Sequence, residues 1–327
     1  MREVREEREE VRRVPAATQP LPVDLVEVTE EEEVLEVSAA ERILTTRQLA
    51  WRRFKRHKLA IVSGAILLLL ALATILVGLF SPYGFAQQDL TARVQPPSGA
   101  HWMGTDQLGR DTFTRVMYGG RISLLVGVAV ALSSALIGTV VGAIAGYYGR
   151  WIDNLLMRVT DLFLAIPFLV ILILGSRLAE QYIPGGSLVH IVIILSLFFW
   201  MPLARIMRGV VLSLKEKEFV EAARATGASD ARIIFVHIIP NTIGPMVVNA
   251  TLSVAAAILT ESALSFLGFG VQPPTPTWGN LLDDTRQFML LAPWLVWFPG
   301  LAILITVLCV NFLGDGLRDA LDPRLKV

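Results

Sequence analysis

The longest uninterrupted apolar run constrains the fold of this chain more than any other feature. Leu59–Phe80 is almost wholly apolar, and as an α-helix it would be about 33 Å long, enough to cross the hydrocarbon core of a bilayer. A signal peptide explains the run less well, because a long charged segment precedes it and the run exceeds the usual hydrophobic region of such a peptide. The 327-residue chain is 54% hydrophobic and has a mean hydropathy of +0.57, which predicts an integral membrane protein.

Further apolar runs bring the predicted number of membrane-spanning helices to six. Small residues are frequent in the second span, which permits close contact between helices in lipid. Pro167 is predicted to kink the third span and Pro202 the fourth. The predicted fold class is an all-α membrane protein with six transmembrane helices. The spans after the first are Ile122–Tyr148, Val159–Leu178, Leu188–Met207, Thr242–Phe269 and Trp294–Leu313.

Lysine and arginine are distributed unevenly between the two sides of the predicted membrane. With the N-terminus placed in the cytoplasm, the cytoplasmic segments after residue 41 hold 18 of these residues and the opposite side holds 6. Basic residues favour the cytoplasmic side of a membrane protein. Both termini are therefore predicted to be cytoplasmic, together with the polar stretch Lys215–Pro240.

Charge and hydropathy divide the chain into three predicted parts. Residues 1–50 are predicted to form a charged cytoplasmic tail, disordered or partly helical, because 13 of the 29 acidic residues lie within Met1–Glu41. A docking segment for a partner is the alternative interpretation of this tail. Residues 51–120 hold a basic collar at the membrane surface, Trp51–Lys58, then the first span and the outer loop. Residues 121–327 hold the remaining five spans.

Several classes of chemistry find no support in the residues. The chain has no G-x-x-x-x-G-K-[ST] phosphate loop, no H-E-x-x-H zinc motif and no G-x-S-x-G nucleophile motif. Cys309, the one cysteine, can form neither a disulfide within the chain nor a cysteine metal cluster. Basic residues gather at membrane edges without interleaved aromatic residues, which argues against nucleic-acid binding. Neither catalysis, a metal site nor a cofactor is predicted for this chain.

The polar stretch Lys215–Pro240 is too charged to cross a bilayer, yet it contains two helical patterns. The first, over Lys215–Ala225, has one narrow face that the backbone of another protein could approach closely. Gly227 follows at a position where a helix end requires a positive φ. Ser229 is predicted to cap the second helix and Pro240 to end it, because proline cannot donate a backbone hydrogen bond. The narrow face consists of Phe219, Ala222, Ala223 and Thr226.

This stretch resembles a known motif. Glu221-Ala222-Ala223, Gly227 six positions after Glu221, and Ile239-Pro240 are similar to the EAA loop of permease subunits of ATP-binding-cassette (ABC) importers. His237 departs from the general pattern, which prefers an aliphatic residue there. The order His237-Ile238-Ile239-Pro240-Asn241 nevertheless resembles the dipeptide/oligopeptide branch of that family. An ordinary helix-turn-helix loop on the cytoplasmic surface is the alternative interpretation.

Two other regions resemble the same branch. The segment HWMGTDQLGRDTFTRVMYGGRISL, residues 101–124, is similar to the branch signature before the second span, with Thr114 where serine is usual. Nearer the C-terminus, residues 261–268, 273–279 and 311–324 are similar to further motifs of the branch. The resemblance covers about Arg52 to Lys326 and leaves out the charged tail.

The resemblance implies a type I ABC importer permease fold with cytoplasmic EAA coupling helices, in the cytoplasmic membrane of a prokaryote. It also implies a second homologous permease, two cytoplasmic ATPases that bind ATP and magnesium, and an extracytoplasmic substrate-binding protein. The substrates implied are dipeptides or oligopeptides, with nickel or glutathione as alternatives. The residues expected to couple the chain to the ATPases are Glu221, Ala222, Ala223, Gly227 and Pro240.

The loop between the first two spans carries charges of both signs. Arg110 and Arg115 can form ion pairs with Asp106 and Asp111, and the nearby glycines suit tight turns. These four charged residues form either a self-satisfied loop or a rim on which an extracytoplasmic binding protein sits. The sequence leaves both interpretations open.

Two acidic residues lie in or near the later spans. Glu261 lies inside a span, where a carboxylate is costly, and it either pairs within the bundle or faces the translocation path. Asp161 lies near a cytoplasmic helix end and is expected to pair with Arg158. If the two acids instead carried protons or ions, the chain would be an autonomous channel or secondary transporter, which the ATP dependence of transport would distinguish. An intramembrane enzyme would need a nucleophile–base or metal pair that the sequence does not show.

Overall fold

The structure, a computed structural model, describes residues 46–321, so the prediction for the charged tail falls almost wholly outside the described residues. The chain divides into two units, and the second, residues 50–327, holds the features that follow. Its described part is built from helices and contains an isolated bridge, between Thr105 and Asp111, but no sheet. The prediction of an all-α fold is confirmed.

Five helical stretches are long and apolar enough to cross a membrane. The first and second predicted spans correspond to α4 and α5, and α5 begins earlier than predicted because Asp111 caps it. The fourth, fifth and sixth predicted spans correspond to α8, α11 and α13. A short helix, α3 (Thr46–Arg56), precedes α4. The long helices are α4 (Lys58–Phe80), α5 (Thr112–Tyr148), α8 (Ser187–Leu214), α11 (Ile243–Phe266) and α13 (Trp294–Leu321).

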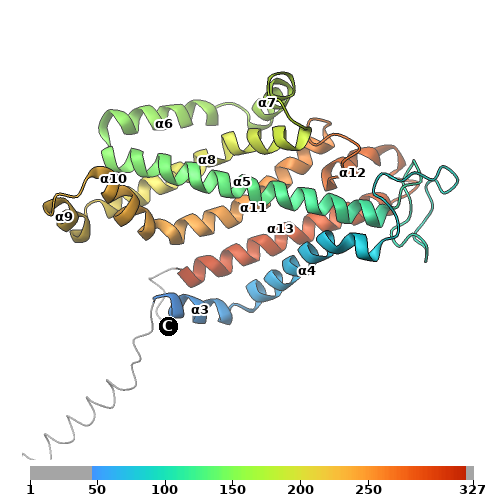
Figure 1. Cartoon of the computed structure of the whole chain (residues 1–327), viewed down its shortest axis with the longest axis horizontal. Helices are drawn as coiled ribbons and strands as arrows, with labels where there is room; N and C mark the ends of the chain where they lie inside the picture. The colour runs from blue at the N-terminus through green and yellow to red at the C-terminus, as the bar shows by residue number, and fades with distance from the viewer. Residues whose placement is uncertain (1–45, 322–327) are drawn as a thin grey trace, which may run out of the picture. The chain divides into compact units, whose positions relative to one another are not determined.

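The third predicted span is broken in two. α6 (Arg150–Leu164) and α7 (Phe168–Tyr182) meet at 92°, with Pro167 immediately before α7 (Figure 1). The position of the kink is confirmed, but the continuous span predicted over Val159–Leu178 is wrong. Proline has no backbone N–H and disfavours a helical conformation in the residue before it, so α6 ends short of Pro167. The described residues therefore provide five spans, or six if the bent pair is one crossing.

The central helix of the bundle is α5, which packs along α8 and α11 (Figure 1). A Cβ atom at Gly138 would lie 2.8 Å from the backbone oxygen of Trp200, and one at Gly146 would lie 2.9 Å from that of Arg208. Both distances are too short for a real Cβ, so glycine is what allows α5 and α8 to approach each other. The predicted role of small residues in close helix contact is confirmed.

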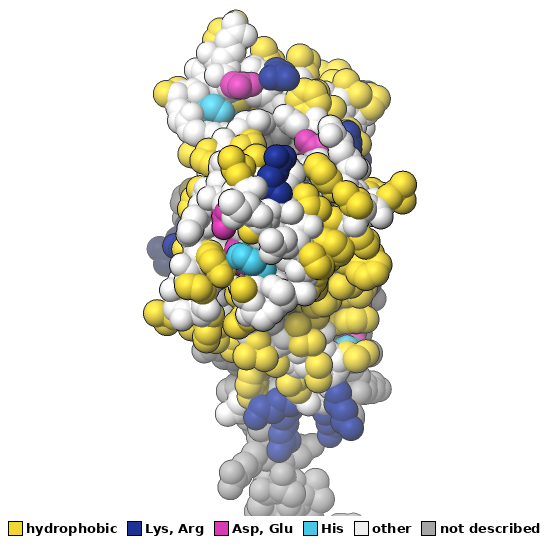
Figure 2. All heavy atoms as spheres, turned by 90° about the vertical axis from the view of Figure 1, so that its right-hand side faces the viewer, with side chains coloured by type: hydrophobic (Ala, Val, Ile, Leu, Met, Phe, Trp, Pro, Cys, Tyr) yellow, Lys and Arg dark blue, Asp and Glu magenta, His cyan; other side chains and the backbone are white. Residues whose placement is uncertain are grey.

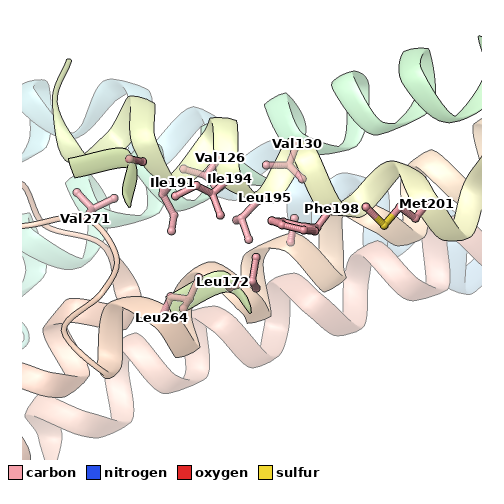
Figure 3. Packing of buried hydrophobic residues seen from close by; sticks show 12 residues of the cluster. Val126, Val130, Leu172, Ile191, Ile194, Leu195, Phe198, Met201, Leu264 and Val271 are labelled. Atoms are coloured by element: carbon pink, nitrogen blue, oxygen red, sulfur yellow. The ribbon is translucent and has the colours of Figure 1, made fainter. Parts of the chain in front are cut away.

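The main apolar core lies between α5, α7 and α8 and reaches α11 (Figure 3). Leu172 of α7 and Leu195 of α8 are fully buried beside Val126 and Val130 of α5. In lipid, such packing stabilises through close contact rather than through removal of apolar surface from water. It holds α7 to the bundle although α7 turns away from α6. Other labelled members of the core are Ile191, Ile194, Phe198, Met201, Leu264 and Val271.

Two regions without long helices lie at opposite ends of the bundle (Figure 1). At the loop end, residues 81–111 lie near the short helix α12 (Trp278–Asp284) and the 3₁₀ turn Arg286–Phe288. At the hairpin end, α9 (Glu218–Ala225) and α10 (Asp230–Arg232) follow α8. Figure 2 shows the loop end, where charged side chains are scattered in the middle and hydrophobic side chains cover the flanks. Extensive exposed apolar surface of this kind is expected of a bundle that lies in lipid.

Candidate functional site

The hairpin segment, residues 215–240, is the predicted coupling element. Its first helix, α9, is confirmed, although it begins at Glu218 rather than at the predicted Lys215. Val220 and Ala223 are buried, whereas Phe219 and Ala222 are exposed. The narrow face predicted from the sequence is therefore divided. Ala223 packs on its own chain, and Phe219 and Ala222 remain available to a partner.

The inner face of the hairpin segment packs on the ends of α5 and α8. Val220 and Ala223 join Ala143 of α5 and Val211 of α8 in a buried cluster that also contains Ile233, Ile234 and Ile238. Tyr147 of α5 donates a hydrogen bond from its hydroxyl to Asp230 Oδ1 at 2.8 Å. The hairpin segment is therefore anchored to both long helices.

The turn between α9 and α10 depends on Gly227. Its φ is 78°, as its position after a helix end predicts. The backbone N–H of Gly227 bonds to the oxygen of Arg224, and that of Ala228 bonds to the oxygen of Ala223, each at 3.0 Å. Ser229 then caps α10 by accepting a hydrogen bond from the backbone N–H of Arg232, which confirms its predicted role.

The helix that begins at α10 does not end at Pro240, so that prediction is wrong. Asp230–Phe266 is one continuous helical stretch, in which a π-helical turn over Ile233–Ile238 and a 3₁₀ turn over Ile239–Thr242 lead into α11. Pro240 lies in the first turn of the 3₁₀ segment, where its missing N–H costs little. The change of helix type at the proline replaces the break, and the hairpin segment is continuous with a membrane span.

The outer surface of the hairpin segment combines apolar and charged side chains. Phe235 and Val236 are 52% and 57% exposed, and Phe219 is 39% exposed. The α9 helix also carries exposed charges, at Glu218, Glu221 and Arg224. Large exposed apolar side chains rimmed by polar residues are typical of a protein-docking surface. The hairpin segment therefore has an inner face packed on its own chain and an outer face that is exposed.

At the loop end, four charged side chains form an ionic cluster. Asp106 accepts a hydrogen bond from Arg110 Nε at 2.6 Å and another from Arg115. Oδ2 of Asp284, on α12, lies 3.3 Å from Arg110 Nη2 and 3.2 Å from Arg115 Nη2. The predicted pairing of both arginines with Asp106 is confirmed, whereas no local sequence pattern points to Asp284. The cluster joins residues 81–111 to α5 and α12.

Asp111 has a different role from the predicted one. Its Oδ2 accepts hydrogen bonds from the backbone N–H and the hydroxyl of Thr114, at 2.8 and 2.6 Å, and its Oδ1 lies 2.9 Å from His101 Nδ1. The predicted pairing of Asp111 with an arginine is wrong, because the N-terminus of α5 binds this carboxylate. Asp106, Arg110, Asp111 and Arg115 are all buried, as the self-satisfied loop requires. Their role as a rim for a binding protein stays a prediction.

Glu261 is fully buried between helices. It accepts hydrogen bonds from the hydroxyls of Ser123 on α5, at 3.1 Å, and Ser265 on α11, at 2.7 Å. The Ser123 hydroxyl in turn accepts a hydrogen bond from the backbone N–H of Trp278, at 3.3 Å, and the Ser265 hydroxyl accepts one from that of Val271, at 3.2 Å. Glu261 thus ties α5 and α11 to the segment that leads into α12. This arrangement matches pairing within the bundle, and a place on the translocation path stays a prediction.

Asp161 pairs with Arg205 of α8, and the predicted pairing with Arg158 is wrong. Both side chains of the Asp161–Arg205 pair are about half exposed. Asp153, two turns earlier on α6, lies 2.5 Å from both Nε and Nη2 of Arg208. Because α6 lies beside α8, arginines of the neighbouring helix reach its carboxylates. The two ion pairs therefore attach α6 to α8.

A metal centre is absent from the part of the chain that the structure describes. Residues 46–321 contain no group of three or more His, Cys, Asp or Glu that could hold a metal ion. Cys309 is free and buried in α13.

Comparison with known proteins places these features in context. The family model for the binding-protein-dependent transport system inner membrane component matches residues 138–327. The model for the N-terminal TM domain of oligopeptide transport permease C matches residues 45–97. Together, the two matches include α4, the last part of α5, the hairpin segment and α13.

Similar curated proteins align with most of the chain. The dipeptide transport system permease protein DppC of Alkalihalophilus pseudofirmus is 46% identical over 277 residues, which are 85% of this chain and 90% of that protein. The oligopeptide transport system permease protein OppC of Mycobacterium tuberculosis is 42% identical, over 86% of this chain and 95% of that protein. The glutathione transport system permease protein GsiD of Pectobacterium atrosepticum is 42% identical, over 84% of this chain and 90% of that protein.

Proposed function

The chain belongs to the family of binding-protein-dependent transport system inner membrane components, and from this we propose that it is the permease subunit of an ATP-driven importer of dipeptides or oligopeptides. The observation that carries the proposal is the hairpin segment, whose inner face is packed on α5 and α8 and whose outer face is open. A segment of this kind suits the transfer of motion from a partner protein to membrane-spanning helices.

The energy for transport comes from partner subunits. The sequence has no phosphate-binding loop, and the resemblance to ABC importer permeases implies two cytoplasmic ATPases that bind the ATP and magnesium. Each ATPase docks on a hairpin segment, one on this chain and one on a second homologous permease. When ATP draws the ATPases together, the hairpin segments move, and the continuous stretch Asp230–Phe266 carries the motion into the membrane.

Within the hairpin segment, the proposed coupling residues divide by role. Glu221 and Ala222 are exposed on α9 and contact the ATPase directly. Ala223 is buried against the chain's own core and keeps α9 close to α5 and α8. Gly227 sets the turn, and Pro240 marks the change of helix type through which α10 joins α11.

The proposed orientation follows from the same element. The hairpin end faces the cytoplasm of a prokaryote, where ATPases can reach it, and both chain termini lie on that side. The loop end faces outward and receives an extracytoplasmic substrate-binding protein. The excess of lysine and arginine on the hairpin side, 18 against 6, supports this orientation.

The test is to reconstitute the complete importer in proteoliposomes and measure uptake of a radiolabelled dipeptide, alanyl-alanine. Uptake is expected to require ATP and the binding protein. Competition with unlabelled glutathione and with nickel ions then identifies the substrate class. Uptake by this chain alone without ATP would contradict the proposal and favour a secondary transporter that uses Glu261 or Asp161.

A substitution in the hairpin segment tests the coupling role within the same assay. Glu221→Ala is expected to lower uptake and substrate-stimulated ATP hydrolysis while leaving membrane insertion intact, because Glu221 is exposed and supports no core contact. Glu31→Ala, a substitution of the same type in the charged tail, is the control. Equal uptake by both variants would remove Glu221 from the coupling residues.

A further inference from the structure

A cavity at the loop end belongs neither to the ionic cluster nor to the hairpin segment. It encloses about 290 Å³ between α7, the start of α8 and the connection that follows α11. This volume is at the small end of the range for ligand sites in proteins. Its polar lining consists of Ser176, Arg177 and Glu180 of α7, Ser187 and His190 of α8, and Gln272.

One cation and one anion lie side by side on the wall of the cavity. Arg177 Nη1 is 3.2 Å from Glu180 Oε2, one helical turn away, and the two side chains are 64% and 63% exposed. The Arg177 guanidinium also lies over the ring of Phe269, 5.1 Å from its centroid. An ion pair this exposed contributes only about 0–1 kcal/mol, so a ligand that separates the two charges loses little.

The deeper wall is polar and already organised. His190 Nε2 is 2.8 Å from the backbone oxygen of Ile183, and because a carbonyl only accepts, Nε2 carries the hydrogen. In the neutral ring, Nδ1 then remains a hydrogen-bond acceptor. Ser187 Oγ accepts a hydrogen bond from the backbone N–H of Gln272 at 3.0 Å, which ties the start of α8 to the connection that follows α11. A preformed wall reduces the entropy lost when a ligand binds.

We propose that this cavity receives the zwitterionic ends of a short peptide, with Arg177 binding its carboxylate and Glu180 its ammonium group. The inference rests on the proposed importer function and names a place where the substrate meets this subunit. Hydrogen bonds between charged groups are the strongest available, and the guanidinium fork matches a carboxylate. A ligand with both charges replaces the contact between Arg177 and Glu180 with two of its own, whereas a peptide with capped ends satisfies neither residue.

The same chemistry could come from a second source, because the headgroup of phosphatidylethanolamine also carries an ammonium and an anionic group. The experiment therefore uses the complete permease–ATPase complex in nanodiscs made with or without this lipid. The binding protein is left out, so that any peptide effect arises at the membrane complex. The probes are alanyl-alanine and its N-acetylated, C-amidated form.

The readout is the reaction rate of a cysteine at the cavity with an impermeant maleimide. Gln272→Cys places a thiol at the exposed wall, and the native Cys309 is buried, so background labelling is low. Alanyl-alanine is expected to slow this reaction several-fold in nanodiscs of either lipid composition, and the capped peptide is not. Ser98→Cys, exposed at the loop end outside the cavity, is the control that neither peptide affects.

Charge removal then tests the assigned residues. Arg177→Gln and Glu180→Gln are each expected to raise the alanyl-alanine concentration for half-protection roughly two- to five-fold, the loss expected for one partly exposed charged contact. Arg286→Gln is the matched control. Arg286 is also exposed, and its Nε lies 3.7 Å from Asp283 Oδ1. Its guanidinium lies over the ring of Phe266, 4.1 Å from the centroid, yet Arg286 does not line the cavity. Its half-protection concentration is expected to stay unchanged.

The inference would be overturned if the capped peptide protected Gln272→Cys from the maleimide as well as alanyl-alanine does, or if phosphatidylethanolamine protected it without peptide. It would also be overturned if the Arg177 and Glu180 variants had the same half-protection concentration as Arg286→Gln. Failure of the maleimide to label Gln272→Cys in the complex would overturn it as well. In each case, uptake by the same preparation with the binding protein restored would still depend on ATP, and the proposed function would stand. Loss of ATP dependence in the unmodified complex would instead reject the proposed function.

Discussion

Gly227→Val is expected to separate docking of the ATPases from folding of the membrane bundle. Gly227 forms the turn between α9 and α10 with a φ of 78°, a conformation that β-branched residues avoid. A valine at this position favours a different turn, which would displace the exposed residues Glu221 and Ala222 relative to α10. The long helices do not depend on this turn, so insertion into the membrane is expected to continue.

The cost of this substitution arises in the backbone alone. No atom lies within 4 Å of the place where a Cβ at Gly227 would sit, so the new side chain meets no neighbour. The left-handed conformation costs an L-residue about 1–2 kcal/mol, which corresponds to about a 5- to 30-fold lower population of the native turn. Asparagine tolerates this conformation, and Gly227→Asn is expected to retain most of the activity.

The assay compares ATPase co-purification, substrate-stimulated ATP hydrolysis and uptake in the reconstituted importer. Gly209→Val provides the matched control, because a Cβ at Gly209 also meets nothing within 4 Å while its backbone lies inside α8. The expected order of activity is Gly209→Val, then Gly227→Asn, then Gly227→Val. If Gly227→Val transported as well as the control with its ATPases fully bound, the hairpin segment would not be the coupling element.

Further predictions concern topology, energy source and stability. A cysteine at Ser98 should react with an impermeant maleimide outside intact cells and one at Ser229 only after permeabilisation, and reaction of both from one side would refute the orientation. The purified chain alone should hydrolyse no ATP, and activity that rises with the amount of chain would refute this. Asp106→Asn should lower stability by about 3–5 kcal/mol, because two buried arginines then face only Asp284. The exposed Asp283→Asn should cost at most about 1 kcal/mol, and equal unfolding midpoints in detergent would contradict the cluster's role.

Most predictions that rested on one residue's backbone or on a helix's own composition held, and the helix end at Pro240 and the continuous third span are the exceptions. Gly227 has the predicted positive φ, Ser229 caps α10, and glycines bring α5 against α8. Each of these outcomes depends on chemistry within a few residues of the chain. Five of the six predicted apolar spans held for the same reason, since the length and composition that a bilayer requires are properties of a single segment.

Predictions that required a partner from elsewhere in the chain were less accurate. Asp161 binds Arg205 of a neighbouring helix in place of Arg158 on its own. Asp284 completes the cluster of Arg110 and Arg115, although 169 or more positions separate it from either arginine. A sequence pattern shows which charges are near in the chain, but the packing of helices decides which charges are near in space.

Pro240 and Pro167 show the same division within the backbone. Both prolines lack an N–H and disturb a helix locally, which the sequence alone reveals. At Pro167 the chain turns by 92°, whereas at Pro240 it continues through π and 3₁₀ turns into α11. Near Pro240, buried contacts of Ile233, Ile234 and Ile238 with α5 and α8 accompany the continued helix. Local chemistry therefore sets where a helix is weakened, whereas the path of the chain beyond that point also depends on packing against other helices, which no local pattern shows.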